Sequence, residues 1–145
     1  MGVDVSTTIE IARPRAEVAD FAADPENAPA WYKNIRSVES LTEPPMTVGS
    51  RLRFVARFLG RRLEYVYEVR ELDPGRRLVM STADGPFAME TSYGWEDAEP
   101  GTTRMSLRNR GEPTGLSKIS APMMAGAIRR ANQADLRRLK RLLEA

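Results

Sequence analysis

The fold is decided by residues 51–69, RLRFVARFLGRRLEYVYEV, in which large apolar residues alternate with charged residues on both sides of a glycine. Alternation with a period of two predicts two half-buried β-strands. Glycine at the first central position of a two-residue loop is typical of a type II′ hairpin, so we expect the turn at Gly60-Arg61. This turn pairs apolar residues across the strands, namely Phe58 with Leu63, Ala56 with Tyr65, Phe54 with Tyr67, and Leu52 with Val69.

The same register brings opposite charges together on the other face of the hairpin. It sets Arg57 opposite Glu64 and Arg53 opposite Glu68. A slip of one residue would turn every side chain to the other face, so it would destroy both the apolar face and the charged pairs. The hairpin therefore needs another layer of structure to cover its apolar face.

Alternation continues toward the C-terminus. Asp84-Gly85 fits a type I′ turn between a strand at about 76–83 and a strand that ends at Trp95, and 97–101 forms a longer loop. The expected partners are Thr82 with Phe87, Met80 with Met89, Leu78 with Thr91, Trp95 with Thr103, Tyr93 with Met105, Thr91 with Leu107, and Glu90 with Arg108. We therefore expect an antiparallel meander with one continuous apolar face.

The N-terminal part begins with a strand over residues 3–12. Pro14 suits the first turn of a helix, whose apolar stripe contains Val18, Phe21 and Ala22. Asp24 is a suitable N-cap for a second short helix that runs toward Trp31-Tyr32. Residues 35–42 alternate poorly, so we expect a strand with a bulge or at a sheet edge.

Helical spacing begins in the last third of the chain. The apolar stripe consists of Met124, Ile128, Ala131, Leu136, Leu139 and Leu143. Pro122 either begins this helix or kinks a longer helix that starts near Thr114. Because the helix is amphipathic, it should pack on the apolar face of the sheet. The fold class is α+β, with a seven-stranded curved antiparallel sheet, two short helices and a long C-terminal helix in a single domain over residues 1–145.

Composition excludes several kinds of chemistry. The chain has neither histidine nor cysteine, which removes the usual neutral-pH base, thiolate nucleophiles and Cys- or His-ligated metals. No calcium-loop or phosphate-loop motif occurs, so we expect no metal and no cofactor. Arginines from 129 to 141 lack interleaved aromatic residues and are balanced by acidic residues, so we expect a solvated helix face and no nucleic-acid partner. We also expect no membrane span, no export signal and a cytoplasmic location.

The candidate site is the inward face of sheet and helix, where large side chains converge. The candidate ligand-binding residues are Trp31, Phe54, Phe58, Tyr65, Tyr67, Met80, Phe87, Met89, Tyr93, Trp95, Met105, Met124, Ile128 and Asn132. Periodicity alone allows either a filled core or an apolar cavity with tyrosine hydroxyls as polar groups. Trp31 is either a gate or a plug, and Asn132 either points inward or lies at a solvated edge. By alternation, the side chains of Glu71 and Asn109 point to the same inward face, but we expect them to be exposed because they lie near strand ends.

The order of elements and several short segments resemble the START-like, or SRPBCC, superfamily of helix-grip proteins. The similarity is greatest to its polyketide cyclase/dehydrase and lipid-transport branch, and it covers essentially the whole chain. The segments that carry it are 9–14 (IEIARP), Val18, Phe21, 24–26 (DPE), Trp31, 48–49 (VG), 67–69 (YEV), 72–74 (LDP), 76–78 (RRL), Leu136, 139–140 (LK) and Glu144. The resemblance implies a cavity between the sheet and the last helix, which relatives use for lipids, polyketides, hormones or other hydrophobic ligands. It carries over no catalytic motif.

The residue pattern and the resemblance together leave three functions open. The first is the binding of a hydrophobic small molecule, such as a lipid, a polyketide or an aromatic metabolite. The second is a cyclase or dehydratase that orients a reactive chain, assisted by tyrosine hydroxyls or a buried carboxylate. The third is a protein-binding module with a filled core and an exposed apolar patch. The sequence specifies neither the ligand nor the oligomeric state.

Overall fold

The computed structural model describes residues 2–84, 87–112 and 120–145. Its strands are β1 (Val3–Ile11), β2 (Ile35–Ser40), β3 (Arg51–Phe58), β4 (Arg61–Asp73), β5 (Arg77–Asp84), β6 (Ala88–Asp97) and β7 (Thr103–Glu112). Its helices are α1 (Arg15–Ala23), the short 3-10 helix η1 (Pro25–Asn27), α2 (Ala28–Trp31) and α3 (Ala121–Glu144). This order matches the α+β architecture expected from the sequence.

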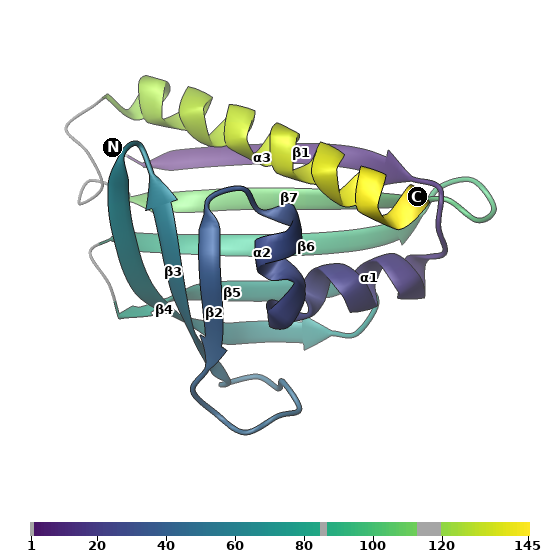
Figure 1. Cartoon of the computed structure of the whole chain (residues 1–145), viewed down its shortest axis with the longest axis horizontal. Helices are drawn as coiled ribbons and strands as arrows, with labels where there is room; N and C mark the ends of the chain where they lie inside the picture. The colour runs from purple at the N-terminus through teal and green to yellow at the C-terminus, as the bar shows by residue number, and fades with distance from the viewer. Residues whose placement is uncertain (1, 85–86, 113–119) are drawn as a thin grey trace.

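All strands form one antiparallel sheet in the order β1-β7-β6-β5-β4-β3-β2. The first strand therefore pairs with the last, and β2 forms the opposite edge. Figure 1 shows α3 crossing the concave side of the sheet near β1, while α1 lies against β6 and α2 lies beside β2. Among the described residues, no helix is both long enough and apolar enough to span a bilayer.

The central hairpin has the expected faces but a different register. Its turn is Leu59-Gly60, both with positive φ, so Phe58 pairs with Arg61 and Phe54 with Tyr65. The predicted pairs are wrong by two residues. The apolar face survives because a shift of two residues preserves the direction of every side chain.

The predicted charged pairs of this hairpin change with the register. Arg57 lies opposite Arg62, and Arg53 pairs with Glu39 on β2 at 2.8 Å. The charge pairs across the hairpin are Arg51–Glu68 at 3.1 Å and Arg53–Glu64 at 3.5 Å.

The other two hairpins show the same displacement. Met80 pairs with Thr91 and Trp95 with Met105, each two residues from the predicted partner. Glu90 pairs with Arg110 at 3.0 Å rather than with Arg108. The expected turn residue Gly85 lies outside the described residues. Alternation fixes which face a residue occupies, but the position of the turn along the chain fixes its partner. The β6–β7 loop covers residues 98–102 and not 97–101.

Irregularities in the ladder bend the sheet around the helix. The pairing of β2 with β3 shifts between Ile35 and Ser37, which confirms a bulge on this edge strand. The pairing of β4 with β5 shifts at Val66/Tyr67 and again at Val69/Glu71. Bulges bend strands and increase their twist, so the long strand β4 can follow the concave surface.

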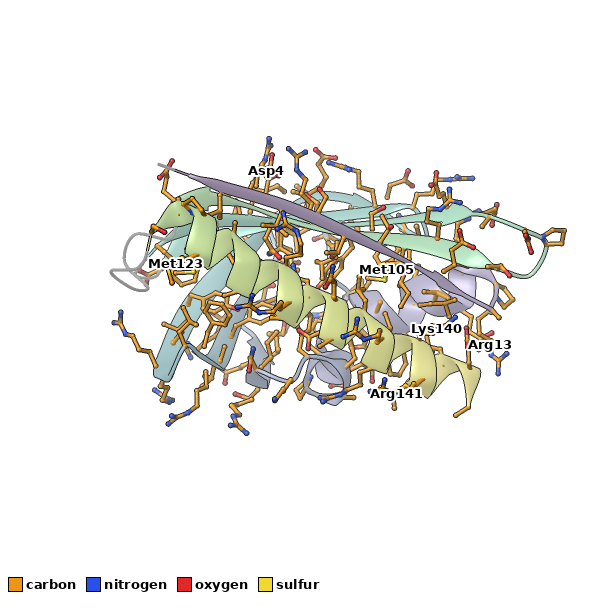
Figure 2. The ribbon with its side chains drawn as sticks, turned by 90° about the horizontal axis from the view of Figure 1, so that it is seen from above. Asp4, Arg13, Met105, Met123, Lys140 and Arg141 are labelled. Atoms are coloured by element: carbon orange, nitrogen blue, oxygen red, sulfur yellow. The ribbon has the colours of Figure 1, made fainter. Side chains whose placement is uncertain are left out.

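Both ends of α3 are held by specific contacts. The Ser120 hydroxyl accepts a hydrogen bond from the Met123 backbone N–H, and Pro122 lies in the first turn. The helix thus begins at Ala121, while the earlier start near Thr114 lies outside the described residues. At the other end, Glu144 accepts a hydrogen bond from the Ala12 backbone N–H at 2.8 Å, and Lys140 donates to the Glu10 carbonyl at 2.7 Å. Figure 2 shows Lys140 and Arg13 close to this end of the helix.

The remaining local predictions concern caps and charge. Asp24 accepts a hydrogen bond from the Glu26 backbone N–H at 3.0 Å and so caps the second helical segment as expected. Pro14 is the N-cap of α1 rather than part of its first turn. Figure 2 shows Asp4 on the side of the sheet away from α3, where it pairs with Arg108 at 2.6 Å.

Candidate ligand cavity beneath the C-terminal helix

A cavity of about 140 Å³ lies between α3 and the concave face of the sheet. The predicted site residues that line it are Phe54, Phe58, Tyr65, Tyr67, Met80, Phe87, Met89, Tyr93, Ile128 and Asn132. They come from β3, β4, β5, β6 and α3, except for Phe87, which immediately precedes β6. The side chains expected to fill a core therefore leave an unfilled volume.

Four predicted residues do not line this cavity. Trp31 is fully buried in the main hydrophobic cluster, which favours the interpretation as a plug over that as a gate. Trp95 and Met105 pair across β6 and β7 in the same cluster, nearer to α1. Met124 packs in a smaller cluster under the first turns of α3. Strand alternation and the helix stripe predicted the inward direction of Trp95, Met105 and Met124, but they do not give the position of a void along that face.

Aromatic rings form one wall of the cavity. Tyr65 is central: its ring stacks on Phe54 with centroids 5.4 Å apart, and it meets Phe87 edge-on at 5.3 Å. Tyr67 tilts against both Phe54 and Tyr65. Such offset and edge contacts hold rings in fixed orientations, so this wall is a rigid apolar surface.

A chain of polar side chains crosses the cavity from helix to sheet. The Asn132 amide donates to Asn109, the Asn109 amide donates to Thr91 at 2.8 Å, and Thr91 shares a hydrogen bond with Tyr67 at 2.9 Å. Asn132 therefore points inward. The expectation that Asn109 is exposed is wrong, because β7 continues to Glu112 and keeps Asn109 half-buried; Glu71 is exposed as expected.

A second polar group was not predicted from the sequence. The hydroxyls of Tyr32 and Tyr93 share a hydrogen bond of 2.7 Å, and the nearby Asp135 carboxylate accepts one from the Lys33 backbone N–H at 3.1 Å. Asp135 is only 3% exposed and lines the cavity. Its position three residues after Asn132 and directly before Leu136 was the available signal, because residues three apart share a helix face.

Burial changes the acid strength of these groups. It raises the pKa of Asp135 from 3.8 to about 6, opposed by the Lys33 backbone N–H and by the positive charges of Arg138 and Lys33. It also raises the pKa of Tyr67 to about 12 and the pKa values of Tyr32, Tyr65 and Tyr93 well above 10. The tyrosines therefore stay neutral near pH 7 and act as hydrogen-bonding groups, whereas Asp135 exchanges its proton close to neutrality.

A larger hollow of about 660 Å³ lies toward α1 and the loop between β2 and β3. Its lining includes Asp24, Met46, Leu72 and Trp95, and shares no residue with the smaller cavity. Across the described part of the chain, no three His, Cys, Asp or Glu side chains are placed to hold a metal ion.

Residues 2–144 match the family described as polyketide cyclase / dehydrase and lipid transport. Among solved structures, a START superfamily protein from Mycobacterium smegmatis is similar with a TM-score of 0.84 and 17% identity, and the match covers 97% of each chain. The ZhuI aromatase/cyclase from Streptomyces sp. R1128 has a TM-score of 0.81 and 19% identity, over 99% of this chain and 94% of that one. The ginseng major latex-like protein 151 from Panax ginseng has a TM-score of 0.75 and 13% identity, over 98% of this chain and 97% of that one. No curated protein matches the sequence. At these identities the solved structures establish the fold alone.

Proposed function

Because the chain belongs to the polyketide cyclase/dehydrase and lipid transport family of START-like proteins, we propose that it binds a hydrophobic small molecule beneath α3. The observation that carries this proposal is the 140 Å³ void, which has a rigid aromatic wall and buried polar groups. Ligand sites are mostly apolar with a few fixed polar groups.

The volume of the cavity narrows the expected ligand classes. An engineered cavity of roughly 150 Å³ holds one benzene molecule. A void of about 140 Å³ is therefore suited to a single aromatic ring. An aromatic metabolite fits this shape better than a sterol or a long polyketide, which would need the cavity to widen.

The test fills the cavity from the helix side and compares two identical substitutions. Ala131 lines the cavity, whereas Ala134, one turn along α3, is exposed. Native mass spectrometry against a denatured control, followed by titration with fatty acids, sterols, aromatic polyketides and single-ring phenols, should identify a ligand of the wild-type protein. Ala131→Leu should then weaken its binding at least tenfold, and Ala134→Leu should not. No binding by any compound, or equal binding by both variants, would overturn the proposal.

A second function is favoured by Asp135. Among the described residues that line the cavity, Asp135 is the one side chain whose pKa lies near neutrality, where a general acid or base works best. In a dehydration, its carboxylate would take a proton from the carbon next to a ligand carbonyl. It would then return that proton to the departing hydroxyl, which leaves as water. The raised tyrosine pKa values disfavour the alternative that a tyrosine is the base.

Product analysis separates the enzyme from the carrier. A carrier returns its ligand unchanged after denaturation. An enzyme converts a β-hydroxyketone probe, and Asp135→Asn should lower its kcat at least a hundredfold, while Tyr65→Phe changes kcat only a few-fold. A protein-binding role is less favoured, because the void argues against a filled core.

A further inference from the structure

The Asp135 carboxylate is a buried acceptor whose bonding capacity is largely unused. It is 3% exposed and accepts one hydrogen bond, from the Lys33 backbone N–H. An ionised carboxylate has about four acceptor positions. None of the ion pairs in the described part of the chain includes it, so the charges of Arg138 and Lys33 act on this carboxylate without direct contact.

The groups that face Asp135 do not supply the missing charge. The positive charges that act on it belong to Arg138, which is half-buried, and Lys33, which is exposed, and neither residue lines the cavity. Tyr32, directly after α2, and Tyr93 on β6 lie near it, but burial raises the pKa of both hydroxyls, so they stay neutral. The lining residues include no Lys or Arg.

Burying a carboxylate without a counter-ion costs free energy. A bound cation that pairs with the carboxylate removes this cost and so gains affinity. The surrounding tyrosine rings add to this preference, because aromatic faces attract cations. An apolar wall suited to one ring and an unpaired carboxylate therefore line the same small void.

We propose that the ligand of this cavity is a small arylalkyl amine in its ammonium form, which pairs its nitrogen with Asp135 and packs its ring on Phe54 and Tyr65. This inference rests on the proposed function, because it names the chemical class that the same cavity binds. It predicts a specific dependence on pH. Asp135 has a pKa of about 6, so the affinity for an ammonium ligand rises as pH increases from 5 to 7.5. The affinity for a neutral alcohol should not rise with pH in this way.

The test uses 2-phenylethylammonium and its neutral analogue 2-phenylethanol as probes, titrated calorimetrically into the whole protein at pH 5 and pH 7.5. At pH 7.5 the wild-type protein should bind the ammonium at least tenfold more tightly than the alcohol, and this preference should narrow at pH 5. Asp135→Asn has the same shape and can still accept from Lys33. It should lose at least tenfold in ammonium affinity, so that its preference for the ammonium over the alcohol disappears.

The outcomes separate this inference from the broader proposal. If the alcohol binds at least as tightly as the ammonium to the wild-type protein at pH 7.5, the amine ligand is wrong and cavity binding stands. An unchanged preference in Asp135→Asn would also overturn it. If neither probe binds, while other hydrophobic compounds do, the amine inference alone fails. If nothing binds, both fail. The wild-type comparison at the two pH values decides the matter even if the variant does not fold.

Discussion

Asp135 is an acid whose ionised form is disfavoured in the folded protein, so it makes stability depend on pH. Below the unfolded pKa both states are protonated and the carboxyl costs nothing. As pH rises through the window from about 4 to about 6, the unfolded chain releases the proton first and stability falls. The full cost, at most roughly 3 kcal/mol for a pKa raised from 3.8 to about 6, is present at pH 7.5.

Asp135→Asn should therefore gain stability relative to the wild-type protein as pH rises. We expect the difference in unfolding free energy between variant and wild type to increase by roughly 2 kcal/mol from pH 4.5 to 7.5. Urea unfolding at the two pH values measures this difference. Glu99→Gln, in the exposed loop between β6 and β7, is the control for removing a carboxylate. If both variants change by the same amount, burial of Asp135 is not the cause.

Thr91 is the second residue whose role can be tested alone. Its hydroxyl joins Tyr67 to Asn109 in the polar chain. Thr91→Val keeps the shape but leaves both partners without this contact, and we expect a loss of about 1–3 kcal/mol in unfolding free energy. Thr8→Val, on the exposed side of β1, should change it by less than about 0.5 kcal/mol. Equal effects would mean that the polar chain does not stabilise the fold.

Among the structural elements, the hairpins show what the sequence could and could not predict. Alternation with period two assigned the faces of β3, of β5 to β7 and of β4 as far as Val69 correctly, because that assignment depends only on counting alternate residues. Beyond Val69 the bulge in β4 reverses the alternation, so that Leu72 packs on the core and Glu71 is exposed. Pairing depends on which two residues form the turn, and the glycine rule favoured Gly60-Arg61. The structure uses Leu59-Gly60, which forces a bulky residue to a φ of 51°. Nothing local to Leu59 indicates that exception.

The β3–β4 turn offers a direct test of this register. Leu59 is 46% exposed, so replacing it removes little burial. Asparagine adopts positive φ more readily and precedes glycine in many type I′ turns, so Leu59→Asn should stabilise the protein by roughly 0.5–1 kcal/mol. Arg61→Asn should give no gain, because Arg61 begins β4 with ordinary φ. Thermal unfolding measures both, and stabilisation by Arg61→Asn alone would favour the turn predicted from the sequence.

The cavity was predictable to the same degree as the hairpins. Its aromatic wall follows from parity, since Phe54, Tyr65 and Tyr67 share the inward face. The inward position of Asp135 does not follow from the sequence pattern, because the stripe along α3 was defined by its apolar residues alone. The partner of Asp135 is a backbone N–H at Lys33, 102 residues away in sequence. Only the packing of α3 against the end of α2 brings them together.

At the scale of the whole molecule, the distance between α3 and the curved sheet sets the size of the ligand. Ile128 and Leu136 are two turns apart on α3, and both are buried. Ile128 lines the cavity, whereas Leu136 packs in the main hydrophobic cluster and does not. Removing either side chain creates a new void, but only one of these voids joins the ligand cavity.

Ile128→Ala and Leu136→Ala should therefore cost similar stability and differ in binding. Each should lower the unfolding free energy by about 2–4 kcal/mol. Ile128→Ala should shift ligand preference from one-ring to two-ring compounds by at least tenfold, because the enlarged cavity accommodates a second ring. Leu136→Ala should leave that preference unchanged. Competition between benzene-based and naphthalene-based probes, at a temperature where both variants are folded, measures the shift. A shared change in preference would mean that general loosening of the helix, and not the local volume under Ile128, selects the ligand.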